Sequence, residues 1–302
     1  MTPDASSPRL QQCIRWLLRS ELRGSGRLVS LLARTFRRLQ CVPVQIRPCE
    51  DVYVDLRYAG SQGLFAGSPW ETSPAESGER TLMAHIVCEG ERVFDIGANI
   101  GLHTIWLSRL VGPGGLVFAF EPNPHLLRCL YQTVAGLSNA RLFSFALSDA
   151  TGKTEFYLPA DHMLGSLADW TRGRVREKAT CLSCEQRTVD ELVQGQILPV
   201  PEFIKCDVEG AELKVFRGAR ETFNNTEAPI ILFESNVYTS AGFGISNTDA
   251  RAFLASLPRP RYEFFSIVET GELADFATPQ AHVNLLAVPR SRISRIEGLR
   301  RS

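Results

Sequence analysis

The chain contains no apolar run long enough to cross a membrane, although 44% of its 302 residues are hydrophobic. A membrane-spanning helix needs about 20 consecutive apolar residues, so we expect no transmembrane segment. The N-terminus also lacks the apolar core followed by small residues that marks a secretory signal. Lysine is scarce, with four residues against twenty-nine arginines. This bias does not point to a particular function.

Cysteine is present without the spacing that a zinc site requires. The eight cysteines are spread along the chain, and Cys181 and Cys184 form the only CxxC motif. A structural zinc site needs a second pair of ligands at a suitable distance, and the sequence offers none. We therefore expect free thiols and a reducing, cytoplasmic environment.

Acidic residues are almost absent from the N-terminal region, although the whole chain has a net charge of zero. Between Arg9 and Arg47 there are nine arginines and no lysine, against Glu21 as the only acid. Apolar residues recur at helical spacing on both sides of a Gly-Ser-Gly turn, which predicts two amphipathic helices within residues 9–39. Such a basic helix can lie on an anionic membrane surface, pack on a partner protein, or pack on the catalytic domain.

Composition divides the chain into three regions. Residues 1–60 predict a basic helical extension with short strands, and residues 291–302 predict a basic tail. Between them, residues 61–290 alternate strands and helices, which predicts an α/β domain. We expect a mainly parallel, seven-stranded sheet with an antiparallel edge. Residues 150–190 break the alternation and predict a β insertion.

Local patterns add three expectations within these regions. The alternation of residues 41–60 predicts a hairpin or paired edge strands. Residues 61–75 are rich in Gly, Ser and Pro and predict a loop. Residues 211–223 predict a single helix after an acidic loop.

The most informative stretch combines a buried strand with a glycine turn. Residues 93–101 read Val-Phe-Asp-Ile-Gly-Ala-Asn-Ile-Gly, and Glu121 ends the next strand twenty residues later. This order is typical of the nucleotide-binding half of a doubly wound sheet. In that fold a helix N-terminus meets an anionic group of the ligand, and the acid holds the ribose diol.

The glycine spacing distinguishes between nucleotides. A dinucleotide fold usually shows G-x-G-x-x-G, whereas this chain has Asp95-x-Gly97-x-x-x-Gly101. An acid just before the turn is unfavourable beside a pyrophosphate and suits the ammonium and sulfonium of S-adenosylmethionine (SAM). The pattern therefore predicts a SAM-dependent methyltransferase and argues against an NAD-linked dehydrogenase.

Polar residues follow five strands of the predicted sheet, at the edge where ligands bind in such folds. The two glycines allow a tight turn and a close approach of the backbone to the ligand. Glu121 is expected to accept both ribose hydroxyls, and Asp149 or the backbone beside it is expected to meet the adenine edge. The predicted cofactor-binding residues are Glu76, Asp95, Gly97, Asn99, Gly101, Glu121, Asn123, Ser148 and Asp149.

Asp207 and Glu209 are the first candidates for the catalytic base. They follow the strand that lies beside the sulfonium in this topology, and a protonated alcohol needs a base to become a good nucleophile. A Mg²⁺ held by these two carboxylates and Glu234 is an alternative, although we predict no metal. The histidines that offer another base are His103, His125 and His162.

These motifs resemble those of the FkbM-type family of SAM-dependent methyltransferases. The similarity extends over about residues 76–289 and leaves the N-terminal region unexplained. It implies a class I, Rossmann-like fold, SAM as cofactor, and O-methylation of a hydroxyl on a carbohydrate or secondary metabolite. The matching segments are Asp95–Gly101, Glu121–Pro124, Ala146–Gly152, Thr188–Leu192, Ile204–Glu212 and Asn284–Pro289.

Other functions stay open at this point. The chain could be a non-catalytic SAM-binding scaffold that docks on a membrane or partner through residues 9–39. Methylation of protein or nucleic acid has weaker support, because the N-terminal stripe is typical of helix packing. We expect a small-molecule or glycan acceptor and no nucleic acid partner, and the sequence leaves the acceptor's identity and the oligomeric state open.

Overall fold

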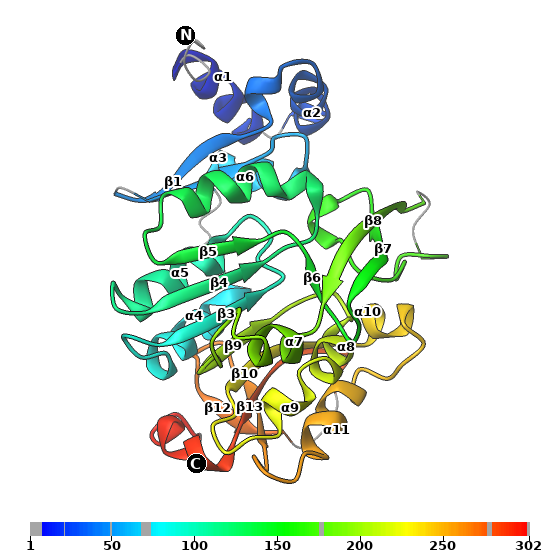
Figure 1. Cartoon of the computed structure of the whole chain (residues 1–302). Coiled ribbons are helices and arrows are strands. Elements are labelled where there is room, and N and C mark those ends of the chain that lie inside the picture. Colours follow the sequence, from blue (N-terminus) through cyan, green and yellow to red (C-terminus); the bar gives the residue numbers. More distant parts are fainter. Residues whose placement is uncertain are drawn as a thin grey trace.

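An eight-stranded β-sheet forms the centre of the protein in the computed structural model (Figure 1). The structure describes residues 8–20, 22–48, 50–67, 74–174, 178–276 and 280–300. In spatial order the strands of this sheet are β12 (Leu273–Asp275), β11 (Glu263–Ile267), β13 (His282–Val288), β10 (Ile230–Asn236), β9 (Phe203–Cys206), β3 (Arg92–Ile96), β4 (Leu116–Phe120) and β5 (Ala140–Phe143).

The sheet is parallel across its centre and antiparallel at one edge. The five strands from β10 to β5 are parallel to one another, and β13, β11 and β12 are added in antiparallel pairs. The predicted mainly parallel sheet with an antiparallel edge is confirmed. The eighth strand, β12, was not expected, because a three-residue strand is too short for an alternating pattern to reveal.

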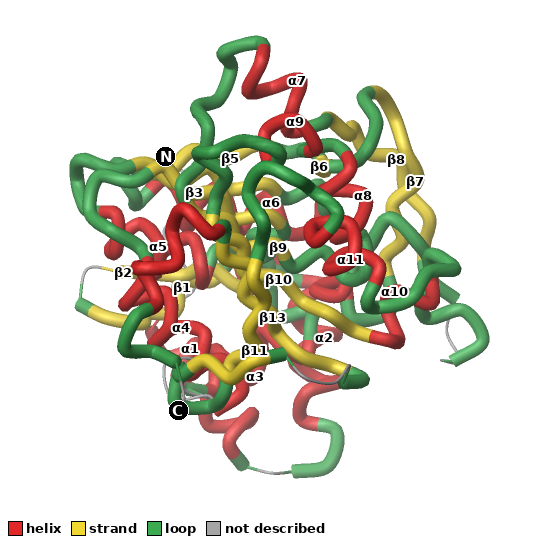
Figure 2. Tube along the Cα trace, turned by 90° about the horizontal axis from the view of Figure 1, so that it is seen from below, coloured by secondary structure: helices red, strands yellow, loops and turns green. Residues whose placement is uncertain are grey.

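Helices cover both faces of the sheet (Figure 2). On one face the apolar side chains of α4 (Pro74–Ile86), α5 (Leu102–Val111) and α6 (Pro124–Ala135) form a core with Val93 of β3. Phe94 points to the opposite face, as the two-residue period of a strand requires. There it belongs to a second core, which also includes apolar residues of α7 (Val189–Gln194), α8 (Glu212–Arg217), α9 (Arg220–Phe223) and α11 (Asp249–Ala255). A further short helix, α10 (Val237–Gly242), follows β10.

The predicted helix over residues 211–223 is divided in two. Gly218 separates α8 from α9, and a Cβ at this position would lie 1.9 Å from the carbonyl oxygen of Ser148. The chain thus bends where two backbones approach closely, and this contact leaves no trace in the helical pattern.

The predicted β insertion forms a small sheet of its own. β7 (Gly152–Leu158) pairs antiparallel with β8 (Thr180–Arg187), and β6 (Ala146–Leu147) joins β8 in parallel. The antiparallel insertion is therefore confirmed, although it lies in a separate three-stranded sheet. A 3-10 turn, η3 (His162–Leu164), follows β7.

The N-terminal region packs on the rest of the chain. It contains α1 (Pro8–Arg19), α2 (Ser25–Thr35), η1 (Arg37–Leu39) and the hairpin β1 (Val42–Arg47) and β2 (Glu50–Val54), so both predicted helices and the paired strands are confirmed. Ile14, Val29 and Phe65 share one core with Leu126 of α6.

The predicted loop over residues 61–75 is wrong at both ends, since α4 already begins at Pro74. Helix α3 (Ala59–Ala66) includes residues 61–66, because burial of Phe65 outweighs the low helix propensity of the glycines around it. Residues 68–73 lie outside the described part of the chain.

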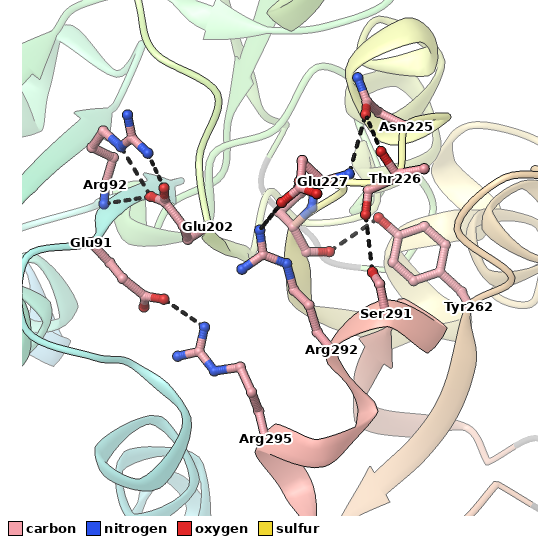
Figure 3. Close-up of polar contacts among 11 residues, drawn as sticks. Glu91, Arg92, Glu202, Asn225, Thr226, Glu227, Tyr262, Ser291, Arg292 and Arg295 are labelled. Carbon is pink, nitrogen blue, oxygen red and sulfur yellow. Dashed lines mark hydrogen bonds and ion pairs between the residues drawn. The ribbon is translucent and has the colours of Figure 1, made fainter.

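The basic C-terminal segment folds back onto the domain. Its 3-10 turn, η4 (Arg290–Ile296), buries Ile296, and Arg295 pairs with Glu91 at 2.5 Å. Figure 3 shows this pair together with Arg292, whose guanidinium faces Glu227. These arginines thus neutralise acids of the domain. Among the described residues, no helix has the length and apolar character needed to span a membrane.

Candidate active site

A cavity of about 170 Å³ lies at the carboxyl ends of β3, β4 and β9. This is the edge where an open α/β sheet binds its ligands. Its wall is built by the glycine turn after β3, the acidic end of β4, residues 163–167, and the loop after β9. Four segments that are distant in the sequence therefore meet around one space.

The glycine turn after β3 lies in close contact with the loop after β9. Gly97 has a φ of +85°, and a Cβ there would lie 1.9 Å from the carbonyl oxygen of Asp207. Only glycine allows the turn after β3 to touch the loop after β9. Gly101 has a φ of +92° and precedes the first residue of α5, and the first two residues of that helix, Leu102 and His103, line the cavity.

Glu121 is buried and holds the glycine turn in place. One carboxylate oxygen accepts the N–H of Asn99 at 2.9 Å, and the other accepts the N–H of Asn123 at 2.8 Å. Burial raises the pKa of Glu121 to about 7, and the two backbone hydrogen bonds oppose that shift. Each oxygen keeps a second lone pair, so the carboxylate can still accept from a diol in the cavity.

Two asparagines join the cofactor side of the cavity to residues 162–167, which we call the strap. The side-chain amide of Asn123 donates to the carbonyl oxygen of His162 at 2.7 Å, and that of Asn99 donates to Met163 at 3.0 Å. At the other end, the hydroxyl of Ser166 donates to the carbonyl oxygen of Glu209 at 2.8 Å. The strap therefore spans the cavity between its two acidic loops.

Sequence reasoning missed the strap and the apolar end of the cavity. The sequence predicts only a β insertion over residues 150–190, and nothing in the composition of the strap signals the two asparagine contacts. The apolar end is lined by Phe120, Phe145, Leu147 and Phe156, which offer aromatic and aliphatic surface to a flat ring. Phe156 lies in the β insertion, where its alternation with exposed residues was the available signal.

Ser148 and Asp149 follow directly after Leu147, the last residue of β6. Asp149 pairs with Lys214 at 3.1 Å, and the buried hydroxyl of Ser148 donates to Asp149 at 3.2 Å. The cavity lining includes neither residue. Glu76 lies in the first turn of α4, and its side chain is outside the described part of the chain.

Lys205 stands between two carboxylates at the end of the sheet. Strand register places it opposite Asp95 of β3, and its ammonium pairs with Asp207 at 3.0 Å. Burial lowers the pKa of Lys205, but the carboxylates of Asp207, Asp95 and Glu79 outweigh that effect and raise it. Lys205 and Asp207 line the cavity, so a fixed positive charge accompanies this acid.

Asp95 is buried below the cavity wall. One carboxylate oxygen accepts the hydroxyl hydrogen of Thr104 at 2.6 Å, and the side chain is not part of the cavity lining. Burial raises the pKa of Asp95, and the ammonium of Lys205 opposes the shift. The structure thus places Asp95 beside Lys205 rather than in the cavity itself.

Glu209 faces the cavity within a group of acids. Burial raises its pKa to about 9, and the nearby charges of Asp207, Glu234 and Glu212 add to the shift. Glu212 supports the loop by accepting the N–H of Val208 at 3.0 Å. At neutral pH Glu209 therefore keeps its proton and presents a hydrogen-bond donor to the cavity.

The three candidate histidines lie in different surroundings. His103 lines the cavity, and burial lowers its pKa well below the usual value. His125 and His162 stack edge to face at 4.6 Å beside Tyr58, outside the cavity lining. Burial lowers the pKa of both and so favours the neutral form of each ring. The strap contributes His162 to this cluster, and α6 contributes His125.

The alternative of a Mg²⁺ site finds no support in the described residues. Within them, no group of three or more His, Cys, Asp or Glu side chains could hold a metal ion. Glu234 instead pairs with His282 at 2.7 Å.

Comparison with known proteins gives a consistent result. Residues 95–264 match the methyltransferase FkbM domain family. The hexuronic acid methyltransferase AglP of Haloferax volcanii is 27% identical over 164 residues, covering 53% of this chain and 64% of that protein. The 2-O-methyltransferase NoeI of Sinorhizobium fredii is 29% identical over 147 residues, covering 44% and 59%. The chain thus spans less than two thirds of either relative.

Proposed function

The chain belongs to the FkbM family of SAM-dependent methyltransferases, and we propose that it methylates a hydroxyl group of a carbohydrate or secondary metabolite. The observation that carries this proposal is that Glu121, Asn99, Asp207 and Glu209 all line the same cavity. Cofactor-binding and acid–base groups there face the same space. The class I, Rossmann-like fold of the family is the architecture described above.

The cavity offers SAM a matching group at each position. Glu121 would accept the ribose hydroxyls, and the amides that begin α5 would meet the carboxylate of the methionyl part. Asn99 Oδ1 is buried without a hydrogen-bond partner among the described residues, which leaves an acceptor for the ammonium group. The apolar end, with Phe145 and Phe156, would hold the adenine. Asp95 would act indirectly, by fixing Lys205.

The acceptor side needs one base and one donor. When bound, SAM supplies an activated methyl group, so positioning of the acceptor oxygen provides much of the rate. We assign Asp207 as the base that takes the hydroxyl proton, because its carboxylate lines the cavity and is paired with the buried Lys205. Glu209 keeps its own proton and would donate a hydrogen bond that positions the acceptor.

A carbohydrate acceptor fits both the site and the relatives. AglP is named for hexuronic acid and NoeI for 2-O-methylation, and we extend a sugar acceptor to this chain as part of the proposal. Polar groups around Asp207 suit a polyol better than an apolar substrate. The seven cysteines among the described residues are free thiols, which supports the cytoplasmic location that we propose. We propose no nucleic-acid partner.

A methyl-transfer assay tests this function. The protein is incubated with methyl-tritiated SAM and a panel of uronic acid glycosides and neutral oligosaccharides. We expect label in a sugar product that survives mild base, because a methyl ether is stable there and a carboxyl methyl ester is hydrolysed. Label that mild base releases, or label found only on protein or RNA added to the same assay, would contradict the proposal.

A further inference from the structure

Large hydrophobic side chains gather on the surface of the N-terminal helices. Twelve such side chains are exposed in the part of the chain that the structure describes, and six of them lie between Leu10 and Phe36. Trp16 is 68% exposed and Leu31 is 62% exposed. Scattered exposed hydrophobics are ordinary, whereas a gathered set indicates an interaction surface.

Helix α2 arranges part of this set on one face. With 3.6 residues per turn, Leu28 and Leu31 lie on the same side of the helix, opposite the buried Val29 and Ala33. The inner face of α2 is therefore already used in packing on the domain. We call a set of exposed residues of α2 and of the turn that follows it the basic apolar face; it consists of Arg27, Leu28, Leu31, Arg34, Phe36 and Arg38.

The arginines of this face differ from those of the C-terminal segment. Arg292 and Arg295 pair with the carboxylates of Glu227 and Glu91. In the described residues, no carboxylate forms an ion pair with Arg27, Arg34 or Arg38. The positive charge of the face thus remains available to an external anion.

We propose that the basic apolar face docks on the surface of an anionic lipid bilayer. A helix that lies in the membrane interface inserts apolar side chains between headgroups and places cations against anionic lipids. Leu28, Leu31 and Phe36 supply the first part and the three arginines the second. Trp16 on the neighbouring helix is a residue type enriched at membrane interfaces. Figure 1 shows α1 and α2 at the end of the molecule away from the C-terminus.

Nucleic acid and protein partners fit these residues less well. Contacts with a phosphate backbone use polar and basic side chains, which would leave the exposed leucines without a role. An acidic protein would need a matching apolar groove as well as carboxylates. A bilayer surface can contact both the apolar side chains and the arginines of the basic apolar face, and it needs no complementary groove.

A vesicle flotation experiment with the full chain tests the proposal without any assay of methyl transfer. Vesicles of phosphatidylcholine with about 30% phosphatidylglycerol, an anionic lipid that makes the surface negative, are compared with pure phosphatidylcholine vesicles. We expect binding to the anionic vesicles that weakens as salt is raised, and little binding to the neutral ones. Arg27→Gln/Arg34→Gln/Arg38→Gln and, separately, Leu28→Ser/Leu31→Ser should each weaken binding at least about tenfold.

Matched control variants carry the same chemical changes elsewhere on the surface. Arg217→Gln/Arg259→Gln/Arg290→Gln and Ile197→Ser/Val200→Ser alter exposed residues outside the N-terminal region, and both should bind like the wild type. Unchanged SAM affinity shows that each variant is folded. Equal binding to neutral vesicles, equal loss in the control variants, or tighter binding to polyuridylic acid than to vesicles would overturn the proposal. Self-association of the lipid-free protein that Leu28→Ser/Leu31→Ser abolishes would overturn it too.

Discussion

At the scale of single residues, Glu121 links the cofactor site to pH. Its pKa is raised to about 7 by burial, and only the ionised carboxylate can accept both ribose hydroxyls. SAM affinity should therefore be constant above pH 8 and fall about tenfold per pH unit well below pH 7. Titration calorimetry from pH 5.5 to 8.5 measures this dependence.

The matched control is Glu121→Gln. It keeps the size of the side chain and removes its titration, so weak affinity that no longer varies with pH is expected. A wild-type affinity that is flat across the same range would show that Glu121 does not carry the pH dependence.

Substitution of a carboxyl group by an amide distinguishes the roles of Asp207 and Glu209. An amide can still donate a hydrogen bond, but it cannot take up a proton as a base. Glu209 is protonated at neutral pH because its pKa is raised to about 9, so Glu209→Gln, which keeps a donor, should retain kcat/KM within about threefold. Glu209→Ala removes the donor and should lose about tenfold or more. Asp207→Asn removes the base and should lose about 100-fold or more, with SAM affinity retained.

Steady-state kinetics on an acceptor found in the methyl-transfer assay would measure these effects. If Glu209→Gln is as damaging as Asp207→Asn, the base is Glu209 and the assignment made here is wrong.

At the scale of elements, the strap is hydrogen-bonded to both sides of the cavity, and we expect it to limit access of the cofactor. The hydroxyl of Ser166 anchors it to the loop after β9, mainly through a hydrogen bond to the carbonyl oxygen of Glu209 at 2.8 Å, with the carbonyl oxygen of Val208 farther away at 3.4 Å. Loss of one such bond costs about 1 kcal/mol, so Ser166→Ala should speed SAM dissociation about fivefold. Stopped-flow displacement can follow this rate through tryptophan fluorescence, because Trp170 donates a hydrogen bond to the strap at Leu164.

Ser183→Ala, on the exposed surface of β8, should leave the rate unchanged. An unchanged rate in Ser166→Ala would show that the strap does not limit release.

Elements that sequence patterns predict well are those whose order is set locally. The strand before Gly97, the acid at position 121 and the loop after Cys206 follow from hydrophobic runs and glycine placement, and the structure brings all three to one cavity. The strap could not be predicted, because its position depends on amide contacts from Asn99 and Asn123 across the cavity. Helix α3 was missed for a related reason, since its glycines signal a loop unless the burial of Phe65 is known.

The sequence also predicts cofactor contacts for residues whose side chains do not line the cavity. Asp95 sits within a motif that predicts cofactor contact, yet its neighbours are Thr104 and Lys205. Asp149 follows a strand end as predicted, and its charge is paired with Lys214. Position along the chain predicts which edge of the sheet a residue reaches, whereas the direction of its side chain depends on partners from other elements. The cofactor roles of both residues stay predictions.

At the scale of the whole molecule, buried acids make stability depend on pH. The pKa of Glu121 is raised to about 7 and that of Glu212 to about 8, while an unfolded glutamate titrates near about 4.3. The folded state therefore binds more protons than the unfolded state in this window, and stability is lost as pH rises. Glu121 alone should account for roughly 3 kcal/mol between pH 5 and pH 8.5.

Urea unfolding of the cofactor-free protein at pH 5.5, 7 and 8.5 measures this trend. The free energy of unfolding should decrease across the series, and Glu121→Gln should reduce the slope. Stability that rises over the same range would indicate that these carboxylates are ionised and well paired in the folded protein.

The central claim is that the cavity binds SAM through Glu121 at the end of β4. Calorimetric titration with SAM and, separately, with NAD tests it most directly, using the wild type, Glu121→Ala and the surface control Glu185→Ala. We predict saturable SAM binding in the wild type and the control, a loss of about 100-fold or more in Glu121→Ala, and no NAD binding. A folded wild-type protein that fails to bind SAM, or one that binds it equally well without Glu121, would contradict the account.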